Sequence, residues 1–225
     1  MDLNISDISR LLLKPEKDIL QLVRKKEIPF NIVHDRIVFN KHHIIEWALE
    51  RNLPLNISGT GKFTEYRIKD ISSLMSPEAF FYDCELAPEA YIEKMISMIH
   101  LEPDVDREII VQLLKSREKM MSTAIGNGIA LPHPRVPLMV GHDRPLINFF
   151  FLRNPIDLNS VDGKPVHTVI LLISQTINQH LSLLAHISFL LSKPSFYQAI
   201  EKRESYDRIT AAVRSIENER TAGGR

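Results

Sequence analysis

The sequence has few residues that form disulfides or cysteine metal sites, and its positive and negative charges balance. Cysteine occurs once, as Cys84, which excludes an internal disulfide and any cluster of cysteine ligands around a metal ion. The 28 lysines and arginines balance 28 aspartates and glutamates, so no net charge attracts nucleic acid or a membrane surface. We expect a protein of a reducing, cytoplasmic compartment, in which any nucleic-acid binding depends on a local surface.

Long apolar runs and common catalytic motifs are also missing. The longest apolar runs, such as LINFFFL and VILLI, are far too short to span a bilayer, and the N-terminus MDLNISDISR is unlike a signal peptide. The sequence contains no GxGxxG, no phosphate-loop GKT or GKS, no HExxH and no GxSxG. We therefore predict no membrane insertion, no cofactor and no metal site.

The residues that are present divide the chain into a small and a larger unit. Residues 53–65 contain Pro, Asn, Ser, Thr and Gly without periodicity, which is typical of a linker. A length of 225 residues accommodates two modest domains, one on each side of it. The predicted organisation is an N-terminal unit 1–52, a linker 53–65, a larger domain 66–217 and a flexible tail 218–225.

The N-terminal unit has the pattern of a winged helix-turn-helix module. The run ISDISRLLL predicts a helix that begins near Ser6 or Asp7, and PEKDILQLVRKK predicts a second that begins at Pro15. Two short β-prone pieces follow in IPFNIVHDRIVFN, and a third helix contains Trp47. Two helices joined by a tight turn, then a hairpin and a third helix, are the elements of that module.

From Tyr66 onward, helical patterns alternate with apolar strands. The runs AFFYDCEL, IALPHPR, LINFFFL and HTVILLIS predict strands, and the last two are continuous enough to be buried on both faces. Helices are predicted in YRIKDISSLM, APEAYIEKMISMIHL, DVDREIIVQLLKSREKM, HLSLLAHISFLLS and SYDRITAAVRSIE, before a frayed ENERTAGGR. The expected fold class is α/β, an α/β sandwich in which helices flank a mixed β-sheet.

One of the nine histidines lies in an unusually rigid context. In GNGIALPHPR, His133 stands between Pro132 and Pro134, which fix the backbone and favour an extended histidine. A reactive imidazole gains from such a fixed orientation, whereas a core histidine does not need it. The histidines with charged neighbours in loops or at helix ends are expected to be solvated: His34, His42, His43, His100 and His142.

Two further residues are candidates for the same chemistry. His180 shares a helix face with apolar residues in the first turn of its helix, so it is either a packed core residue or one edge of a site. A helix N-terminus could help His180 to hold a phosphate. Arg117 ends a helix just before the glycine turn. It is either a surface charge or, beside a phosphorylated histidine, a forked donor to the phosphoryl oxygens.

The run REKMMSTAIGNGIALPHPR, residues 117–135, resembles the active-site segment of the enzyme IIA domains of the bacterial phosphoenolpyruvate sugar phosphotransferase system. The resemblance is to the fructose/mannitol class and most of all to its nitrogen-regulatory type. That segment reads approximately R-E-x-x-x-S/T-x-I-G-x-G-x-A-I/L-P-H, and this chain fills it without a gap. The likeness continues over residues 66–217 and implies the fold of such a domain.

The resemblance also implies roles for individual residues. His133 would accept a phosphoryl group from the histidine phosphocarrier protein HPr, and His180 and Arg117 would stabilise that group. The residues that would shape the turn beneath the site are Gly126, Asn127 and Gly128. Family members usually follow the histidine with glycine and then lysine or threonine, whereas this chain has Pro134 and Arg135. Pro134 removes a backbone N–H, and Arg135 adds a charge that compensates.

The N-terminal unit is similar to the small winged helix-turn-helix domains of the excisionase/MerR type, through KKEIPFNIVHDRIVFNKHHIIEWAL. The similarity implies that PEKDILQLVRKK is a recognition helix. Its residues nearest a DNA groove would be Lys17, Gln21, Arg24 and Lys25. Residues 1–52 contain nine basic and eight acidic residues, a weak excess for a DNA-binding domain. DNA binding and a protein-docking or dimerising role both stay open.

We interpret the chain as a regulatory phosphocarrier, a phosphohistidine transferase component whose state at His133 changes its binding to a protein target or to DNA. One alternative is a sugar-transport IIA component that passes its phosphoryl group to a IIB protein. Another is a DNA-binding or scaffold protein that is not phosphorylated and uses the IIA fold as a docking surface.

Overall fold

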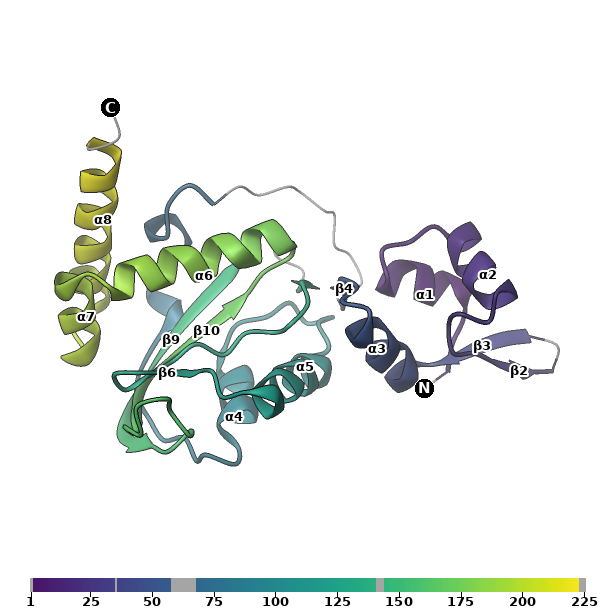
Figure 1. The fold of residues 1–225 in the computed structure, drawn as a ribbon, viewed down its shortest axis with the longest axis horizontal. Coiled ribbons are helices and arrows are strands. Elements are labelled where there is room, and N and C mark those ends of the chain that lie inside the picture. Colours follow the sequence, from purple (N-terminus) through teal and green to yellow (C-terminus); the bar gives the residue numbers. More distant parts are fainter. Residues whose placement is uncertain (1, 35, 58–67, 141–143, 223–225) are drawn as a thin grey trace.

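The computed structural model describes residues 2–34, 36–57, 68–140 and 144–222, which form two folded units (Figure 1). The helices are α1 (Ile5–Leu11), α2 (Glu16–Arg24), α3 (Lys41–Glu50), α4 (Tyr91–Met98), α5 (Arg107–Met120), α6 (Ile177–Leu191), α7 (Pro194–Glu201) and α8 (Tyr206–Ala222), with 3-10 turns η1 (Ser72–Leu74) and η2 (Pro77–Ala79). The strands are β1 (Asp2–Leu3), β2 (Asn31–Val33), β3 (Arg36–Asn40), β4 (Leu55–Asn56), β5 (Phe80–Cys84), β6 (Ala124–Gly126), β7 (Ile129–Ala130), β8 (Leu138–Met139), β9 (Leu146–Ile156) and β10 (Val166–Ile173). None of the described helices combines the length and apolar character that a membrane crossing requires.

The N-terminal unit starts with a helix that is capped earlier than the sequence predicted. The Asn4 side chain accepts a hydrogen bond from the Asp7 N–H, and the Asp7 carboxylate accepts one from the Asn4 N–H, both at 3.0 Å. This reciprocal cap starts α1 at Ile5, next to the predicted start near Ser6, but the capping residue is Asn4, so the prediction that Ser6 or Asp7 caps the helix was wrong. Helix α2 packs on α1, and β1, β3 and β2 form a small antiparallel sheet.

The larger unit is built on a five-stranded mixed sheet of order β5-β9-β10-β7-β6. The central pair β9–β10 and the pair β6–β7 are antiparallel, whereas β5–β9 and β7–β10 are parallel. Side chains of β9 alternate between two cores, since Phe150 and Leu152 pack with residues of α4 and α5, and Phe149 and Phe151 pack with residues of α6, α7 and α8. Helices therefore cover both faces of a mixed sheet, as the sequence predicted (Figure 1).

At the C-terminal end, one helix was not predicted and one prediction was wrong. The segment that follows α6 forms a separate helix, α7. Pro194 is its first residue, a position at which a proline removes no hydrogen bond of the helix. Helix α8 continues to Ala222, so residues 218–222 belong to a helix rather than to a flexible tail. The end of the predicted tail, residues 223–225, lies outside the described residues.

Two other segments have less regular structure than predicted. Only Ile129–Ala130 of IALPHPR forms a strand, because the prolines that follow cannot donate to a sheet ladder. The predicted helix in YRIKDISSLM contains only the 3-10 turn η1, and its first two residues lie outside the described part of the chain.

The start of the predicted linker is a strand. Of that segment, the structure describes residues 53–57. Within them β4 pairs in parallel with β8, Leu55 opposite Leu138 and Asn56 opposite Met139. The apolar core is continuous across this contact, because residues of both units belong to it. The linker prediction was therefore wrong for these residues, whose apolar side chains are buried against the larger unit.

Candidate functional site

His133 lies just beyond β7, at the end of the sheet where β10 leads into α6. Its Nδ1 is 2.7 Å from the Leu131 carbonyl oxygen, which can only accept, so Nδ1 carries the ring proton and Nε2 keeps a lone pair. The Pro132 carbonyl accepts the Leu172 N–H at 3.0 Å, which ties the segment to β10. Pro134 is buried and the imidazole is half-buried. The histidine is therefore held in one orientation by its own backbone.

His180 is the neighbour of His133 across this end of the sheet. Thr176 caps α6 by accepting the Gln179 N–H at 3.1 Å, which fixes the first turn of the helix. The two imidazole centroids are 5.1 Å apart and the rings are inclined by 53°. Of the two readings left open by the sequence, the structure places His180 at the edge of the candidate site, half-buried beside His133.

Both imidazoles are neutral at pH 7. Burial lowers the pKa of His133 below 6.5, the Arg117 charge lowers it further, and the hydrogen bond to Leu131 opposes them. Burial, followed by the charges of His133 and Arg117, lowers the pKa of His180 to about 4. A neutral His133 whose Nδ1 is protonated presents the unprotonated Nε2 that a nucleophile needs.

Arg117 comes to the histidine pair from the last turns of α5. It is half-buried, and its Nη1 donates to the Met121 carbonyl at 2.8 Å. Its neighbour Glu118 accepts hydrogen bonds from the Thr123 N–H and, at 2.6 Å, from the Thr123 hydroxyl. These bonds tie the end of α5 to the start of β6 and so fix where the guanidinium emerges. Thr123 and Glu118 were not singled out from the sequence as positioning residues.

The glycine turn lies at the other end of β7 from His133. The Gly128 carbonyl accepts the N–H groups of His167 and Thr168, near the first residues of β10, whereas His133 adjoins the last ones. The Asn127 N–H donates to Asp162 at 2.8 Å, and the Tyr197 hydroxyl donates to the Asn127 carbonyl at 3.2 Å. The structure does not bring this turn to the histidine pair, because β7 and the extended segment after it separate them.

The turn has a structural purpose that the motif alone does not show. The residues with positive φ in it are Gly126 (100°), Asn127 (52°) and Gly128 (71°). A Cβ added to Gly128 would lie 2.2 Å from Cδ2 of His167, so only glycine lets the imidazole ring pack on this backbone. Hydrogen bonds lower the pKa of Asp162 to about 2. The bond from the Ser160 hydroxyl has the largest effect, and the bond from the Asn127 N–H comes next. Asp162 is therefore an ionised anchor for the turn, and the sequence offered no signal for it.

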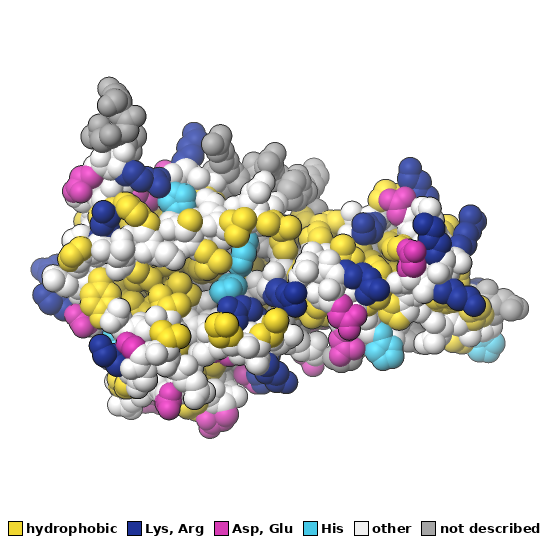
Figure 2. Space-filling view, viewed as in Figure 1, with side chains coloured by type: hydrophobic (Ala, Val, Ile, Leu, Met, Phe, Trp, Pro, Cys, Tyr) yellow, Lys and Arg dark blue, Asp and Glu magenta, His cyan; other side chains and the backbone are white. Residues whose placement is uncertain are grey.

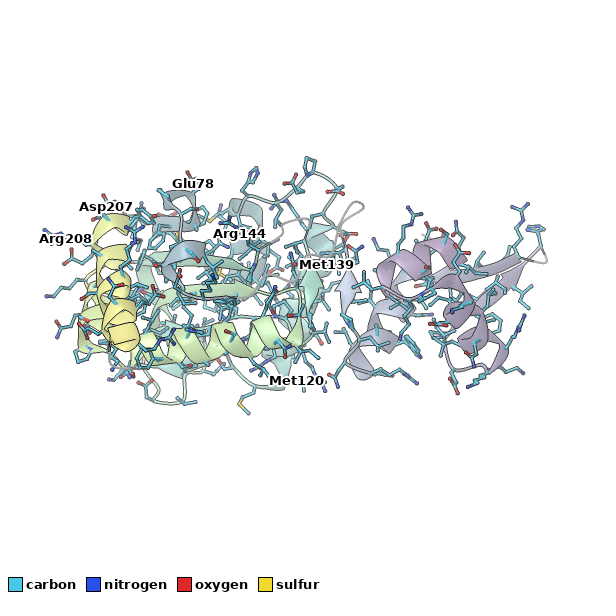
Figure 3. The ribbon with its side chains drawn as sticks, turned by 90° about the horizontal axis from the view of Figure 1, so that it is seen from above. Glu78, Met120, Met139, Arg144, Asp207 and Arg208 are labelled. Atoms are coloured by element: carbon cyan, nitrogen blue, oxygen red, sulfur yellow. The ribbon has the colours of Figure 1, made fainter. Side chains whose placement is uncertain are left out.

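The surface around the histidine pair is apolar and basic. The exposed apolar side chains on α5, after α5 and in the first turns of α6 are Met120, Met121, Ile177 and Leu181. Arg135 is exposed, with Nη1 4.0 Å from the Met120 sulfur, and Met120 lies at the rim of the molecule (Figure 3). Figure 2 shows two adjoining histidine side chains on this face, with basic side chains on one side and apolar ones on the other.

The candidate DNA-contacting residues lie on a different unit. All four of them are exposed, on or just after α2: Lys17, Gln21, Arg24 and Lys25. Gln21 and Lys25 line a hollow of about 470 Å³ with Trp47 and Arg51, whose guanidinium carbon lies 4.7 Å from the indole centroid. Helix α2 is at the far end of the molecule from α6 (Figure 1), so the structure does not join these residues to the histidines. Among the described residues, no group of three His, Cys, Asp or Glu side chains is arranged to hold a metal ion.

The lowered pKa of His180 predicts a loss of stability in acid. His180 has a pKa near 6.5 when unfolded and about 4 when folded, so the unfolded chain binds more protons between these values. Stability is therefore lost as the pH falls from about 6.5 to about 4. In His180→Gln, the fall in Tm between pH 7.5 and pH 4.5 should be smaller than in the wild type by about 3 °C. Scanning calorimetry measures this, and His43→Gln, at an exposed position of α3, should behave as the wild type does. An equal fall in His180→Gln and wild type contradicts the prediction.

Comparison with known proteins relates this geometry to a family. The model of the family described as "Phosphoenolpyruvate-dependent sugar phosphotransferase system, EIIA 2" matches residues 74–216. A nitrogen regulatory protein of Bradyrhizobium diazoefficiens is 32% identical over 150 residues, which cover 65% of this chain and 93% of that protein. A nitrogen regulatory protein of Pseudomonas aeruginosa is 28% identical over 130 residues, 56% of this chain and 82% of that protein.

A multidomain relative and a solved structure complete the comparison. The fructose-specific EIIABC component of Bacillus subtilis is 30% identical over 124 residues, 54% of this chain but 19% of that protein. The crystal structure of the nitrogen regulatory protein IIA-Ntr from Neisseria meningitidis superposes with a TM-score of 0.53 at 23% identity, over 64% of this chain and 98% of that one. That structure shares the α/β fold of the larger unit. Because the family model matches more than half of this chain, the chain belongs to the type 2 EIIA family of the phosphoenolpyruvate-dependent sugar phosphotransferase system.

Proposed function

We propose that this protein is a regulatory phosphoryl carrier and that His133 Nε2 is the atom that carries the phosphoryl group. The observation that supports it most directly is the Leu131 carbonyl on Nδ1, which leaves the Nε2 lone pair available. In the step, Nε2 attacks the phosphorus of a phosphohistidine on HPr, and the P–N bond of the donor breaks with its electron pair returning to the donor imidazole. The proton on Nδ1 stays in its hydrogen bond to Leu131, and the other ring nitrogen of the donor carries a proton, so the donor leaves as a neutral imidazole.

Arg117 and His180 supply the charge and hydrogen bonds that the transferred group needs. Phosphoryl transfer depends mainly on in-line positioning and on charge stabilisation, because the protein has little covalent chemistry of its own to perform. The Arg117 guanidinium gives up its hydrogen bond to the Met121 carbonyl and donates two hydrogen bonds to the phosphoryl oxygens instead. A neutral His180 donates its ring N–H, and an adjacent dianion raises its pKa and so favours the protonated form.

The surface around the site suits a protein donor. Met120, Met121, Ile177 and Leu181 are between 57% and 69% exposed, which is a large apolar area for residues so close to the histidines. Arg135 adds a positive charge beside them. A transient interface typically combines an apolar centre with a charged rim, and this arrangement would receive HPr and then a downstream partner.

In this proposal the phosphorylated and unphosphorylated forms differ in their binding to a protein target or to DNA, and this difference is regulatory. The relatives named nitrogen regulatory proteins align with most of their length, whereas the fructose component aligns with a small part of its own. The N-terminal unit, a winged helix-turn-helix module in this proposal, would supply the second binding function through Lys17, Gln21, Arg24 and Lys25 on exposed α2. Phosphorylation adds a dianion and so changes what this molecule binds.

The test is phosphorylation by phosphoenolpyruvate, enzyme I and HPr, followed by intact-protein mass spectrometry. The wild type should gain one acid-labile phosphoryl group, and His133→Ala should gain none. His186→Ala is the matched control, because His186 lies two turns along α6 from His180 and its Nδ1 bonds to the Ser182 carbonyl. This variant should be phosphorylated as the wild type is. An unphosphorylated wild type, or a phosphorylated His133→Ala, would overturn the proposal.

A second candidate is a sugar-transport component that passes the group to a IIB protein. The similarity to the fructose-specific EIIABC component favours it. Adding a fructose-type IIB domain to the phosphorylated protein separates the two candidates. Complete transfer within seconds supports transport, and a phosphorylated protein that persists beside the IIB domain supports regulation.

A further inference from the structure

The N-terminal unit is attached to the larger one at the strand that follows His133. The Leu55 N–H of β4 donates to the Pro137 carbonyl at 3.1 Å, and the Ile57 N–H donates to the Met139 carbonyl at 3.2 Å. On its other side, β8 donates its Leu138 N–H to the carbonyl of a residue at the end of β10, Ser174, at 2.8 Å. Strand β8 therefore lies between the N-terminal unit and the connection that leads to α6 and His180.

The chain between His133 and β8 is stiff. Pro134 and Pro137 fix two of the backbone φ angles, and the residues from Val136 to Val140 are buried. A shift of the backbone at His133 is therefore carried along the segment to β8 rather than absorbed by a flexible loop. The β4–β8 pairing consists of two residues on each strand, so it is the small contact that must adjust.

A second contact joins the N-terminal unit to the helix of Arg117. The Lys41 ammonium, at the start of α3, lies 2.6 Å from a carboxylate oxygen of Asp106, which caps α5. Burial raises the pKa of Asp106, but the Lys41 bond and the N–H groups of α5 outweigh it and hold this pKa below its usual value. The ion pair is therefore present at neutral pH. Both contacts of the N-terminal unit reach elements that carry or adjoin residues of the site.

We propose that phosphorylation of His133 releases β4 from β8 and so loosens the N-terminal unit from the larger one. This inference rests on the proposed function. The β4–β8 pairing is present in the structure, where His133 is packed between two buried prolines. A dianion on Nε2 draws in Arg117 and His180 and displaces the stiff segment, and the two-residue pairing gives way. By linkage, release of the N-terminal unit favours phosphorylation by the same factor.

The experiment uses phosphoramidate as the donor, which removes the dependence on HPr. Nε2 of His133 attacks the phosphorus, the P–N bond of phosphoramidate breaks, and ammonia leaves. Amide hydrogen exchange is then followed by NMR. The Leu55 and Ile57 amides should exchange at least fivefold faster in the phosphorylated protein, while the His167 amide, bonded to Gly128 far from β8, should not change. His133→Ala treated with phosphoramidate should show no change.

The reverse effect tests the coupling from the other side. Lys41→Ala, which breaks the ion pair with Asp106, and Ile57→Asp, which disrupts the buried edge of β4, should each raise the equilibrium ratio of phosphorylated to unphosphorylated His133, at fixed phosphoramidate and ammonia, at least threefold above wild type. Ile32→Asp is the matched control, because Ile32 is 67% exposed on β2 of the same unit. It should label as the wild type does.

The outcomes separate this inference from the proposed function. Labelling by phosphoramidate without labelling through HPr contradicts the carrier function and leaves the coupling measurable. Complete phosphorylation with unchanged Leu55 and Ile57 exchange overturns the coupling alone. If His133 stays unlabelled in wild type, Lys41→Ala and Ile57→Asp alike, the phosphorylation on which the coupling rests does not occur, and the coupling is overturned together with the proposed function.

Discussion

Arg117→Gln is expected to lower the rate of phosphoryl transfer to His133 by about a hundredfold, an effect of the size seen when one charge-stabilising donor is removed from a transition state. The charge of Arg117 already lowers the pKa of both His133 and His180, so its field reaches the place where a phosphoryl group on His133 would lie. Its resting bond to the Met121 carbonyl uses one nitrogen and fixes the side chain near the pair. Glutamine keeps a polar side chain but loses the charge and the fork.

Two further variants show that the effect belongs to this guanidinium. Lys119→Gln removes an exposed cation two residues along the same helix and should leave the rate within twofold of wild type. Arg117→Lys keeps the charge but not the forked geometry, so its rate should lie between those of wild type and Arg117→Gln. Rapid-quench measurement of phosphorylated protein gives all the rates. Equal rates for Arg117→Gln and Lys119→Gln would mean that Arg117 acts only through the net charge.

Gly128→Ala is expected to reduce the free energy of unfolding by about 3 kcal/mol, because strain at a positive φ and an overpacked contact add together. The new methyl group would lie 2.2 Å from Cδ2 and 2.4 Å from Nε2 of His167, at a φ of 71°. The ring cannot turn away freely, since its Nδ1 is 2.9 Å from the Thr168 hydroxyl oxygen. Urea unfolding measures the difference.

Gly163→Ala separates the two causes. Gly163 has nearly the same φ, 69°, but no atom lies within 4 Å of its added Cβ, so only the backbone strain of about 1 kcal/mol applies. Adding His167→Ala to Gly128→Ala should recover most of the remaining loss, as a double-mutant cycle would show. If Gly128→Ala and Gly163→Ala lose the same stability, the contact with His167 does not constrain the turn.

The sequence predicted the part of the site that depends on local geometry. The prolines around His133 indicated the first imidazole, and the place of His180 in the first turn of its helix made it one of two alternatives, a core residue or an edge of the site. Continuous apolar runs indicated the two buried central strands. For Arg117, which the sequence left as either a surface charge or a donor to the phosphoryl group, the family resemblance favoured the second. These features depend on residues near each other along the chain, where dihedral restrictions and helical spacing are informative.

Contacts between distant segments could not be predicted in this way. Asp162 holds Asn127 across 35 residues, and Tyr197 reaches the same residue across 70. Neither contact produces a period or a motif. The pairing of Leu55 with Leu138 was hidden for a different reason, since the turn-forming residues after Leu55 made the whole segment resemble a linker. The glycine turn was placed beneath His133 because the motif is continuous in sequence, although a strand separates its two ends in space.

The single cysteine has a practical consequence for experiments on this protein. Cys84 ends β5 and is 4% exposed, and burial, followed by the charge of Asp83, raises the pKa of its thiol. Maleimides react with the thiolate, so the protonated and buried thiol of Cys84 is unreactive towards them at neutral pH. A second cysteine introduced at an exposed position such as Ile32 would be labelled selectively, without first removing Cys84 from the core. Fluorescent probes can therefore be attached to either unit of the otherwise unaltered chain.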